Sequence, residues 1–249
     1  MRIIACFKVS PEDQEIQAQP DRTLSFERAP WKIGPYDLNA IEAARQLADQ
    51  TGGTVIGLSA GGAALTNAKL TKDALSRGLD ELATIIDDAM AGAESFQTAS
   101  ALAQGVAQLG DVDLVLVGAG SSDAYTQQVG NQLGVLLGWP VLNAVDAIKA
   151  DGDRLVVDRV LENGVQVVEV TLPAVLSVTA GINEPRIAGM KDILAAGKKP
   201  VTALSLTEPL PAPTATLQSV LAPELLARQH VLFEGADAVA GLAAHLKAL

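Results

Sequence analysis

Residues 120–130, with the sequence GSSDAYTQQVG, combine small and polar side chains in a pattern that can hold an anion. They follow the apolar run DVDLVLVGAG and precede VGNQLGVLLG, whose apolar positions have helical spacing. The first N–H groups of a helix lack intrahelical partners and carry partial positive charge, so a phosphate can bind there. The small residues that would let it approach the backbone are Gly118, Ala119, Gly120, Ser121 and Ser122. Side-chain donors could come from Thr126, Gln127 and Gln128. An ordinary capped turn, with Ser122 or Asp123 as the N-cap, is the alternative interpretation.

Two other turns have a similar composition. In KIGPYDLNAIEAA, residues 32–44, Pro35 restricts the turn and Asp37 is placed to cap the following helix; plain capping is favoured over a binding role. In IGLSAGGAALTNAK, residues 56–69, the small residues from Ser59 to Gly62 end a strand and open a helix. Because the carboxyl ends of parallel strands meet at one edge of a sheet, we expect the three turns to converge. Convergence favours a ligand the size of a nucleotide.

The rest of the composition narrows the chemistry. Eighteen Lys and Arg against 29 Asp and Glu give a formal charge of −11, which opposes binding to nucleic acid or to an anionic membrane. With Cys6 as the one cysteine, no internal disulfide or cysteine metal site can form. Two histidines, His230 and His245, leave little material for a catalytic triad or a metal centre. No apolar stretch approaches the roughly 18 residues of a membrane span, and MRIIACFKVS is too brief for a secretory signal, so we expect a cytoplasmic protein.

Apolar runs alternate with Ala- and Leu-rich segments, which predicts an α/β fold with a doubly wound, mostly parallel, Rossmann-like sheet. The expected strands are 2–8, 54–59, 82–86 and 112–117, and the expected helices are 37–50, 63–77, 97–109 and 125–137. Residues 141–178 alternate around Asp-Gly and Asn-Gly pairs and predict an antiparallel excursion. From residue 201 the chain becomes Pro-rich but stays too apolar for a free linker, so it is expected to lie along a surface before a closing helix at 235–248.

Several motifs, in this order, resemble the β-subunit of electron-transfer flavoproteins: FKVSPEDQEI, IGPYDLNAIEAA, LSAGG, TNAKLTKDALSRGLDEL, GSSDAYTQQVG and LPAVLSVTAGINEPRIAGMKDILAAGKKP. The Gly-Ser-Ser-Asp and Gln-Gln-Val-Gly forms are most similar to the FixA-type subunits of anaerobic carnitine and nitrogen-fixation systems. The resemblance covers about residues 1–200. It divides the chain into a nucleotide-binding domain, 1–200, and a C-terminal arm, 201–249, that packs on an α-subunit.

The resemblance implies a heterodimer with a FixB-like α-subunit that carries FAD, while this chain binds AMP or, in electron-bifurcating members, a second FAD. Electrons would pass between a dehydrogenase or NADH and a quinone, ferredoxin or CoA-ester reductase, through FixC-, FixX- or acyl-CoA dehydrogenase-like partners. The chain would be an electron carrier with no bond-making residues, rather than a classical enzyme. The implied nucleotide contacts are Cys6 near the adenine, Gly34, Pro35, Tyr36, Asp37, Ala60, and, around the phosphate, Ala119, Gly120, Ser121, Ser122, Asp123, Tyr125, Thr126, Gln127, Gln128, Val129 and Gly130.

The resemblance also implies a partner-docking loop at residues 183–199, with Met190 as the apolar anchor that inserts into the redox partner. Arg186, Ile193, Leu194, Lys198 and Lys199 belong to the same segment. Without the resemblance, the apolar residues at helical spacing would be core residues and the two lysines a solvated helix end. Arg186 either holds the loop or meets the α-subunit.

The chain departs from the family pattern at three places. It has Gly34 before Pro35 where the family has Asn, Tyr125 where the family has a second carboxylate, and Val160 where many members have an acidic residue. A nucleotide-sensing module that binds AMP or ATP without electron transfer remains the alternative function. A nucleotide-activating transferase is disfavoured, because residues 33–37, 59–62 and 118–130 contain no Lys or Arg to face a transferred phosphate.

Overall fold

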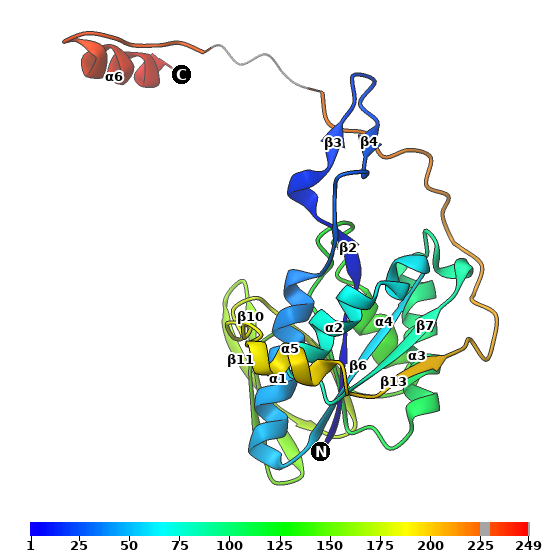
Figure 1. Cartoon of the computed structure of the whole chain (residues 1–249). Coiled ribbons are helices and arrows are strands. Elements are labelled where there is room, and N and C mark those ends of the chain that lie inside the picture. Colours follow the sequence, from blue (N-terminus) through cyan, green and yellow to red (C-terminus); the bar gives the residue numbers. More distant parts are fainter. Residues whose placement is uncertain (225–229, 249) are drawn as a thin grey trace.

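The computed structural model describes residues 1–224 and 230–248. Its described part is built on a nine-stranded sheet with the order β11-β10-β9-β12-β8-β1-β6-β7-β13 (Figure 1). The strands are β1 (Arg2–Cys6), β6 (Thr54–Gly61), β7 (Glu81–Ile86), β8 (Leu114–Gly118), β9 (Val141–Asp151), β10 (Arg154–Leu161), β11 (Gly164–Thr171), β12 (Ala174–Val178) and β13 (Val201–Leu204).

The central strands are parallel and buried on both faces. β1 pairs in parallel with both β6 and β8, and β12 and β7 extend the parallel part on either side. Consecutive residues Ile3 and Ile4 are both fully buried, because adjacent strand residues face opposite sides of a covered sheet. The four predicted strands are therefore confirmed, as is the mostly parallel α/β fold.

Helices cover both faces of the sheet, which makes the fold doubly wound. α1 (Pro35–Thr51) and α2 (Ala68–Ser76) pack with Ile3 and Ala5 on one face. α3 (Ser95–Leu109) and α4 (Val129–Leu137) pack with Ile4 and Cys6 on the other.

Two helix starts differ from the sequence predictions. The helix expected at 63–77 divides into a 3₁₀ turn, Ala63–Thr66, and α2, because the side chain of Asn67 accepts a hydrogen bond from Lys69 N–H and restarts the helix. Asn67 is thus a cap rather than an ordinary surface residue. The helix expected from 125 begins at Val129, which lengthens the loop that precedes it.

The predicted antiparallel excursion is present between residues 141 and 178. β9, β10 and β11 form an antiparallel meander with turns at Gly152 and Glu162-Asn163, and β12 then returns to the parallel sheet between β8 and β9. Gly152 has a φ of 62°, which is why glycine follows Asp151 at that turn.

A smaller excursion follows β1 at the carboxyl edge of the sheet. β2 (Val9–Pro11) pairs with β5 (Trp31–Ile33), and β3 (Gln17–Ala18) pairs with β4 (Leu24–Ser25), with a 3₁₀ turn at Asp13–Glu15. Figure 1 shows this hairpin-like extension projecting beyond the sheet. A further 3₁₀ turn, Asp88–Met90, follows β7, and α5 (Met190–Ala196) packs beside α2.

The sheet continues just past residue 200, because β13 pairs in parallel with β7 at the sheet edge. The segment that follows runs along α3, where the side chains of Gln97, Gln104 and Gln108 hydrogen-bond its backbone. It then meets the β3–β4 region, where Arg22 contacts Ala222 and Glu224. The expectation that this segment lies along a surface is met by the chain's own α3.

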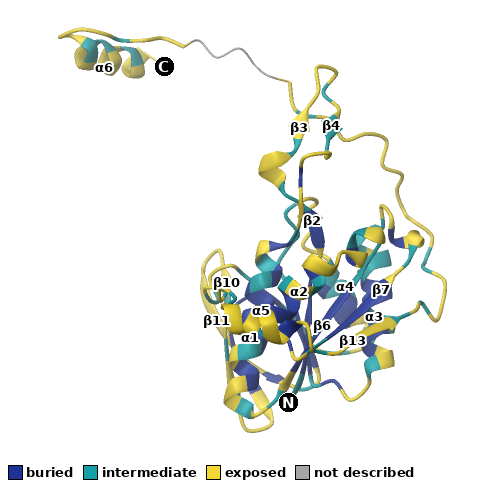
Figure 2. Ribbon diagram, viewed as in Figure 1, coloured by how far each residue is buried: buried dark blue, intermediate teal, exposed yellow. Residues whose placement is uncertain are grey.

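Most of the described residues beyond β13 are exposed (Figure 2). The expected closing helix is present as α6 (Ala238–Ala248), and none of its residues is buried. In the part of the chain that the structure describes, no helix is long and apolar enough to cross a bilayer.

Gln104 provides a test of the path of the C-terminal segment. Its Oε1 accepts from the N–H groups of Thr207 and Glu208 at 2.7 and 3.0 Å. Gln104→Ala should lower the free energy needed to detach this segment from α3 by about 1 kcal/mol. The detached state should then be populated roughly fivefold more. Limited proteolysis after β13 measures this opening. Gln50→Ala, at the exposed end of α1, is the control, and equal cleavage of both variants would contradict the attachment.

Candidate functional site

A cavity of about 610 Å³ lies at the carboxyl ends of the central strands. The chain runs from β1 to β6 and β7 on one side and then places β8 on the other side of β1. Ligands of open α/β sheets bind at such a switch point, because the following loops diverge and leave a crevice. The cavity volume falls within the range of pockets for small molecules and cofactors.

The cavity brings together the ends of four strands. Cys6 follows from β1, Ala60 and Gly61 from β6, Met90 from the turn after β7, and Gly118 from β8. The three small-residue turns expected to converge do contribute to one cavity, although the second of them contributes only Asp37.

Asp37 is the buried polar group at the base of the cavity. Its Oδ2 accepts a hydrogen bond from Lys8 N–H at 2.7 Å, and Gly118 N–H also donates to its carboxylate. Burial raises the pKa of Asp37 to about 7, and the two backbone hydrogen bonds oppose that rise. A Cβ at Gly118 would meet Asp37 Oδ1 at 2.5 Å, so only glycine allows this approach.

The prediction that Asp37 caps its own helix is wrong. The N-cap of α1 is Gly34 and Pro35 occupies the first turn, while the Asp37 carboxylate is turned toward the ends of β1 and β8. The helix tolerates the missing side-chain cap because proline has no N–H to satisfy.

Cys6 lines the cavity but is not poised as a nucleophile. Burial, with a smaller contribution from the charge of Asp37, raises the pKa of its thiol far above the usual range. A protonated, buried thiol behaves as a small apolar wall.

The loop from Gly118 to Gln128 has a specified conformation. Tyr125 N–H donates to the Ser121 carbonyl at 3.1 Å, and Tyr125 and Gln127 have φ values of 44° and 57°. Left-handed conformations are costly for such residues, so the surrounding contacts must impose them. One such contact is the Tyr125 ring, which lies 5.7 Å from the ring of Tyr36.

The alternative interpretation, in which Ser122 or Asp123 caps the helix after this loop, is wrong. α4 begins beyond them, with Gln128 at the N-cap and no side-chain cap bond. Ser122 Oγ instead contacts Ser10 Oγ at 3.0 Å, and Asp123 pairs with Lys8. The first N–H groups of α4 are therefore left without a side-chain cap at residues that line the cavity.

Most of the predicted nucleotide contacts line this one cavity. Those that do are Cys6, Asp37, Ala60, Ala119, Gly120, Ser121, Asp123, Thr126, Gln127, Gln128, Val129 and Gly130. Those outside the lining are Gly34, Pro35, Tyr36, Ser122 and Tyr125. The structure places Tyr36 and Tyr125 against each other, so that the first turn of α1 contacts the loop before α4.

Sequence reasoning missed several parts of the cavity wall, of which two bear on the chemistry of the site. Lys8, just after β1, directs its Nζ to Asp123 Oδ2 at 2.6 Å, so a cation is present although none occurs in residues 33–37, 59–62 and 118–130. The second part is the stretch from Met90 to Ser95. Its Met-Ala-Gly-Ala sequence follows a strand just as the other small-residue turns do, and that signal could have identified it.

The segment predicted to dock a partner, 183–199, presents apolar side chains to solvent. Met190 is 73% exposed, Ile187 93% and Leu194 66%, while Ile193 is 36% exposed. These exposures argue against the alternative in which Met190, Ile193 and Leu194 are core residues. Lys198 is exposed, but Lys199 is half-buried and donates to the carbonyls of Leu75 and Leu79.

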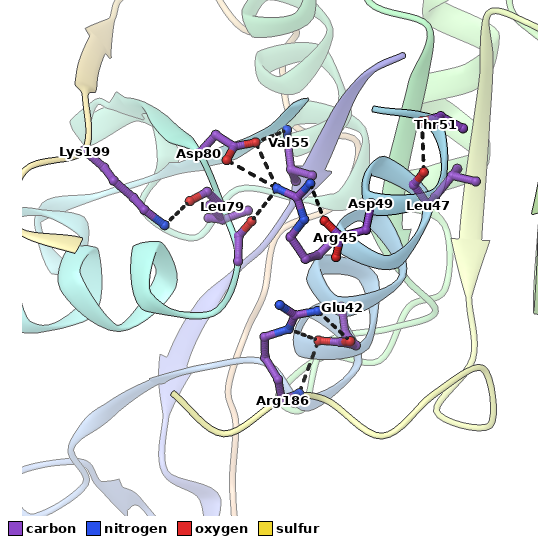
Figure 3. A network of polar contacts seen from close by, with 11 residues as sticks. Glu42, Arg45, Leu47, Asp49, Thr51, Val55, Leu79, Asp80, Arg186 and Lys199 are labelled. Atoms are coloured by element: carbon purple, nitrogen blue, oxygen red, sulfur yellow. Dashed lines mark hydrogen bonds and ion pairs between the residues drawn. The ribbon is translucent and has the colours of Figure 1, made fainter. Parts of the chain in front are cut away.

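Polar contacts fix both ends of this segment to the domain (Figure 3). Arg186 Nε donates to Glu42 Oε2 at 2.6 Å, and Arg186 NH2 donates to Oε1 at 3.1 Å. Burial would raise the pKa of Glu42, but hydrogen bonds from Arg186 and Gln46 outweigh it and hold the pKa below its usual value. At the other end Lys199 Nζ binds Leu79 O at 2.6 Å. Arg186 therefore holds the segment against α1.

The fold and the cavity define a doubly wound α/β protein with a cofactor-sized pocket at the switch point of its sheet. Residues 23–209 match the family model of the electron transfer flavoprotein domain. Because the match spans well over half of the chain, the protein belongs to the electron transfer flavoprotein family. Members of this family generally bind FAD or AMP.

The raised pKa of Asp37 predicts a pH dependence of stability. The pKa rises from 3.8 in the unfolded chain to about 7 in the folded protein, so the folded state binds the proton more tightly. Asp37 contributes on the order of a few kcal/mol to the free energy of unfolding. This contribution is complete below about pH 4 and is lost as the pH rises through about 7. Asp37→Asn cannot titrate and should make this decline shallower.

Chemical denaturation at several pH values between about 4 and 8 measures the free energy of unfolding of each variant. Asp151→Asn, at the exposed end of β9, is the control and should leave the decline unchanged. An Asp37→Asn profile parallel to that of the original protein would contradict the assignment.

Proposed function

We propose that this chain is the β-subunit, of FixA type, of a heterodimeric electron-transfer flavoprotein. It binds AMP or a second FAD in the cavity at the switch point, and its FixB-like α-subunit carries FAD. The observation that carries the proposal is the cavity itself, in which uncapped N–H groups of α4, hydroxyl and amide side chains, and one lysine surround a volume suited to a nucleotide.

The donor set of the cavity fits an adenylate. Ser121, Thr126, Gln127 and the start of α4 provide donors for phosphate oxygens. Leu102, Val117, Ala60 and Cys6 provide an apolar wall suited to a planar base. When FAD is bound, the flavin supplies the redox chemistry, and the chain contributes position and electrostatics.

Partner contacts are proposed for two surfaces. The first is the docking segment 183–199, whose exposed Met190 and Leu194 can adapt to different redox proteins. These partners are FixC-, FixX- or acyl-CoA dehydrogenase-like proteins, which link the subunit to NADH, a quinone or ferredoxin. The second is the C-terminal arm 201–249, proposed to pack on the α-subunit. It exposes Leu217, Leu232 and Val239 at 80% each, more apolar surface than a segment in water usually presents.

Isolation of the complex tests the function. Co-expressed with its α-partner, the chain should give a yellow heterodimer, from which flavin and AMP are released and counted. One FAD with one AMP indicates simple electron transfer, and two FAD without AMP indicate electron bifurcation. A complex with exchangeable nucleotide and no flavin would instead support the nucleotide-sensing function and would overturn the proposal.

Met190→Glu tests the docking segment. A charge at this exposed anchor should lower the rate of partner reduction by about tenfold or more, because interface anchors carry a large share of the binding energy. Bound nucleotide should be unchanged, since Met190 does not line the cavity. Val135→Glu on α4 is the control, because Val135 is 76% exposed and Met190 73%. Loss of nucleotide from Met190→Glu would show that cavity and docking segment are not separate.

A further inference from the structure

An ion pair lies inside the cavity. Lys8 Nζ contacts both carboxylate oxygens of Asp123, at 2.6 and 2.8 Å. The two side chains come from opposite sides of the switch point, 115 residues apart, and each remains partly exposed, at 48% and 40%. A pair this exposed adds little to folding, so stability does not explain why it faces the cavity.

Lys8 is held in place by its own backbone. Its N–H donates to the buried Asp37, and its carbonyl accepts from Gly34 N–H at 3.0 Å. The lysine side chain therefore starts from a fixed point at the end of β1 and extends to the loop before α4. Asp123 also accepts from Ala124 N–H at 2.8 Å, which orients its carboxylate.

The charges around the cavity are unequal. Among the described residues that line it, Lys8 is the one Lys or Arg, whereas Asp37, Glu94 and Asp123 are acidic. Glu94 lines the cavity as a residue, but its carboxylate accepts hydrogen bonds from Thr214 and Ala215, which lie outside the lining. The other source of positive potential is the start of α4, equivalent to about half a charge. The cavity can thus compensate only a small anionic charge.

We propose that Lys8 is the specificity-determining residue of the nucleotide site, and that its pairing with Asp123 limits the phosphate charge that the site accepts. The inference rests on the proposed nucleotide-binding function and narrows its ligand class. The bound phosphate pairs with the Lys8 ammonium group, either in place of Asp123 or together with it. Ligands with a total charge of about −2, either a nucleoside monophosphate or a dinucleotide with a bridging diphosphate, are accepted. Nucleoside triphosphates are rejected, because each further phosphate charge meets the carboxylate of Asp123 without a second cation.

Binding of adenosine, AMP, ADP, ATP and FAD to the full-length chain, in the complex in which it is isolated and after removal of bound nucleotide, tests this assignment. Isothermal titration calorimetry should give AMP an affinity at least tenfold higher than that of ATP. Lys8→Met should lower the affinity for AMP roughly ten- to a hundredfold and change the affinity for adenosine less than about twofold. Lys8→Arg should recover most of the AMP affinity. Asp123→Asn should reduce the ratio of the AMP affinity to the ATP affinity by about fivefold or more.

Lys149→Met and Asp151→Asn are the matched controls, since both change the same charges at exposed positions of β9 outside the cavity. Equal binding of AMP and ATP by the original protein, or an Asp123→Asn variant that keeps the full ratio, would overturn the charge limit and leave the nucleotide site intact. A Lys8→Met variant that weakens adenosine as much as AMP would assign Lys8 to folding instead. If the original protein binds neither these adenylates nor FAD, the proposed function and this inference both fail.

Discussion

The carboxylate of Asp37 joins the three segments on which the cavity depends. It belongs to the first turn of α1, and it binds the backbone of Lys8 after β1 and of Gly118 at the end of β8. These two strand ends flank the switch point of the sheet. A buried carboxylate is costly unless backbone donors satisfy it, so this arrangement constrains the chain closely. The glycine at 118 and the position of Lys8 both follow from that constraint.

α1 connects the cavity with the docking segment. Its first turn carries Asp37, and two and five residues further along Asn39 and Glu42 hold Asn183 and Arg186. Asn39 and Asn183 exchange hydrogen bonds, each side-chain amide donating to the other residue's carbonyl at 2.8 and 3.0 Å. α1 therefore contributes Asp37 to the cavity and also anchors the proposed docking segment, so one helix links the two regions.

The sequence was informative where burial decides the structure. The strands β1, β6, β7 and β8 were predicted because their apolar runs are buried on both faces, and the antiparallel excursion because its turns require Asp-Gly and Asn-Gly. The convergence of small-residue turns also followed from parallel topology. These features depend on local composition and on a general rule of sheet architecture.

The sequence was less informative where a side chain had a choice of partner. Asp37 and Asp123 have the residue type of helix caps, but both bind Lys8 instead. Asp37 accepts from the Lys8 N–H, and Asp123 accepts from the Lys8 ammonium group. Such pairings join residues 29 and 115 positions apart, and no local pattern encodes them. The stretch after β7 was overlooked because Asp87 and Asp88 separate its small residues from the end of the strand.

Glu94 connects the cavity wall to the tail of the chain. One of its oxygens binds Ala215 N–H at 2.7 Å, and the other binds Thr214. The same residue thus lines the cavity and holds the backbone of the segment that runs along α3. Binding free energies are coupled reciprocally. If a ligand in the cavity changes how strongly Glu94 binds this segment, displacement of the segment must change the affinity for that ligand by the same factor.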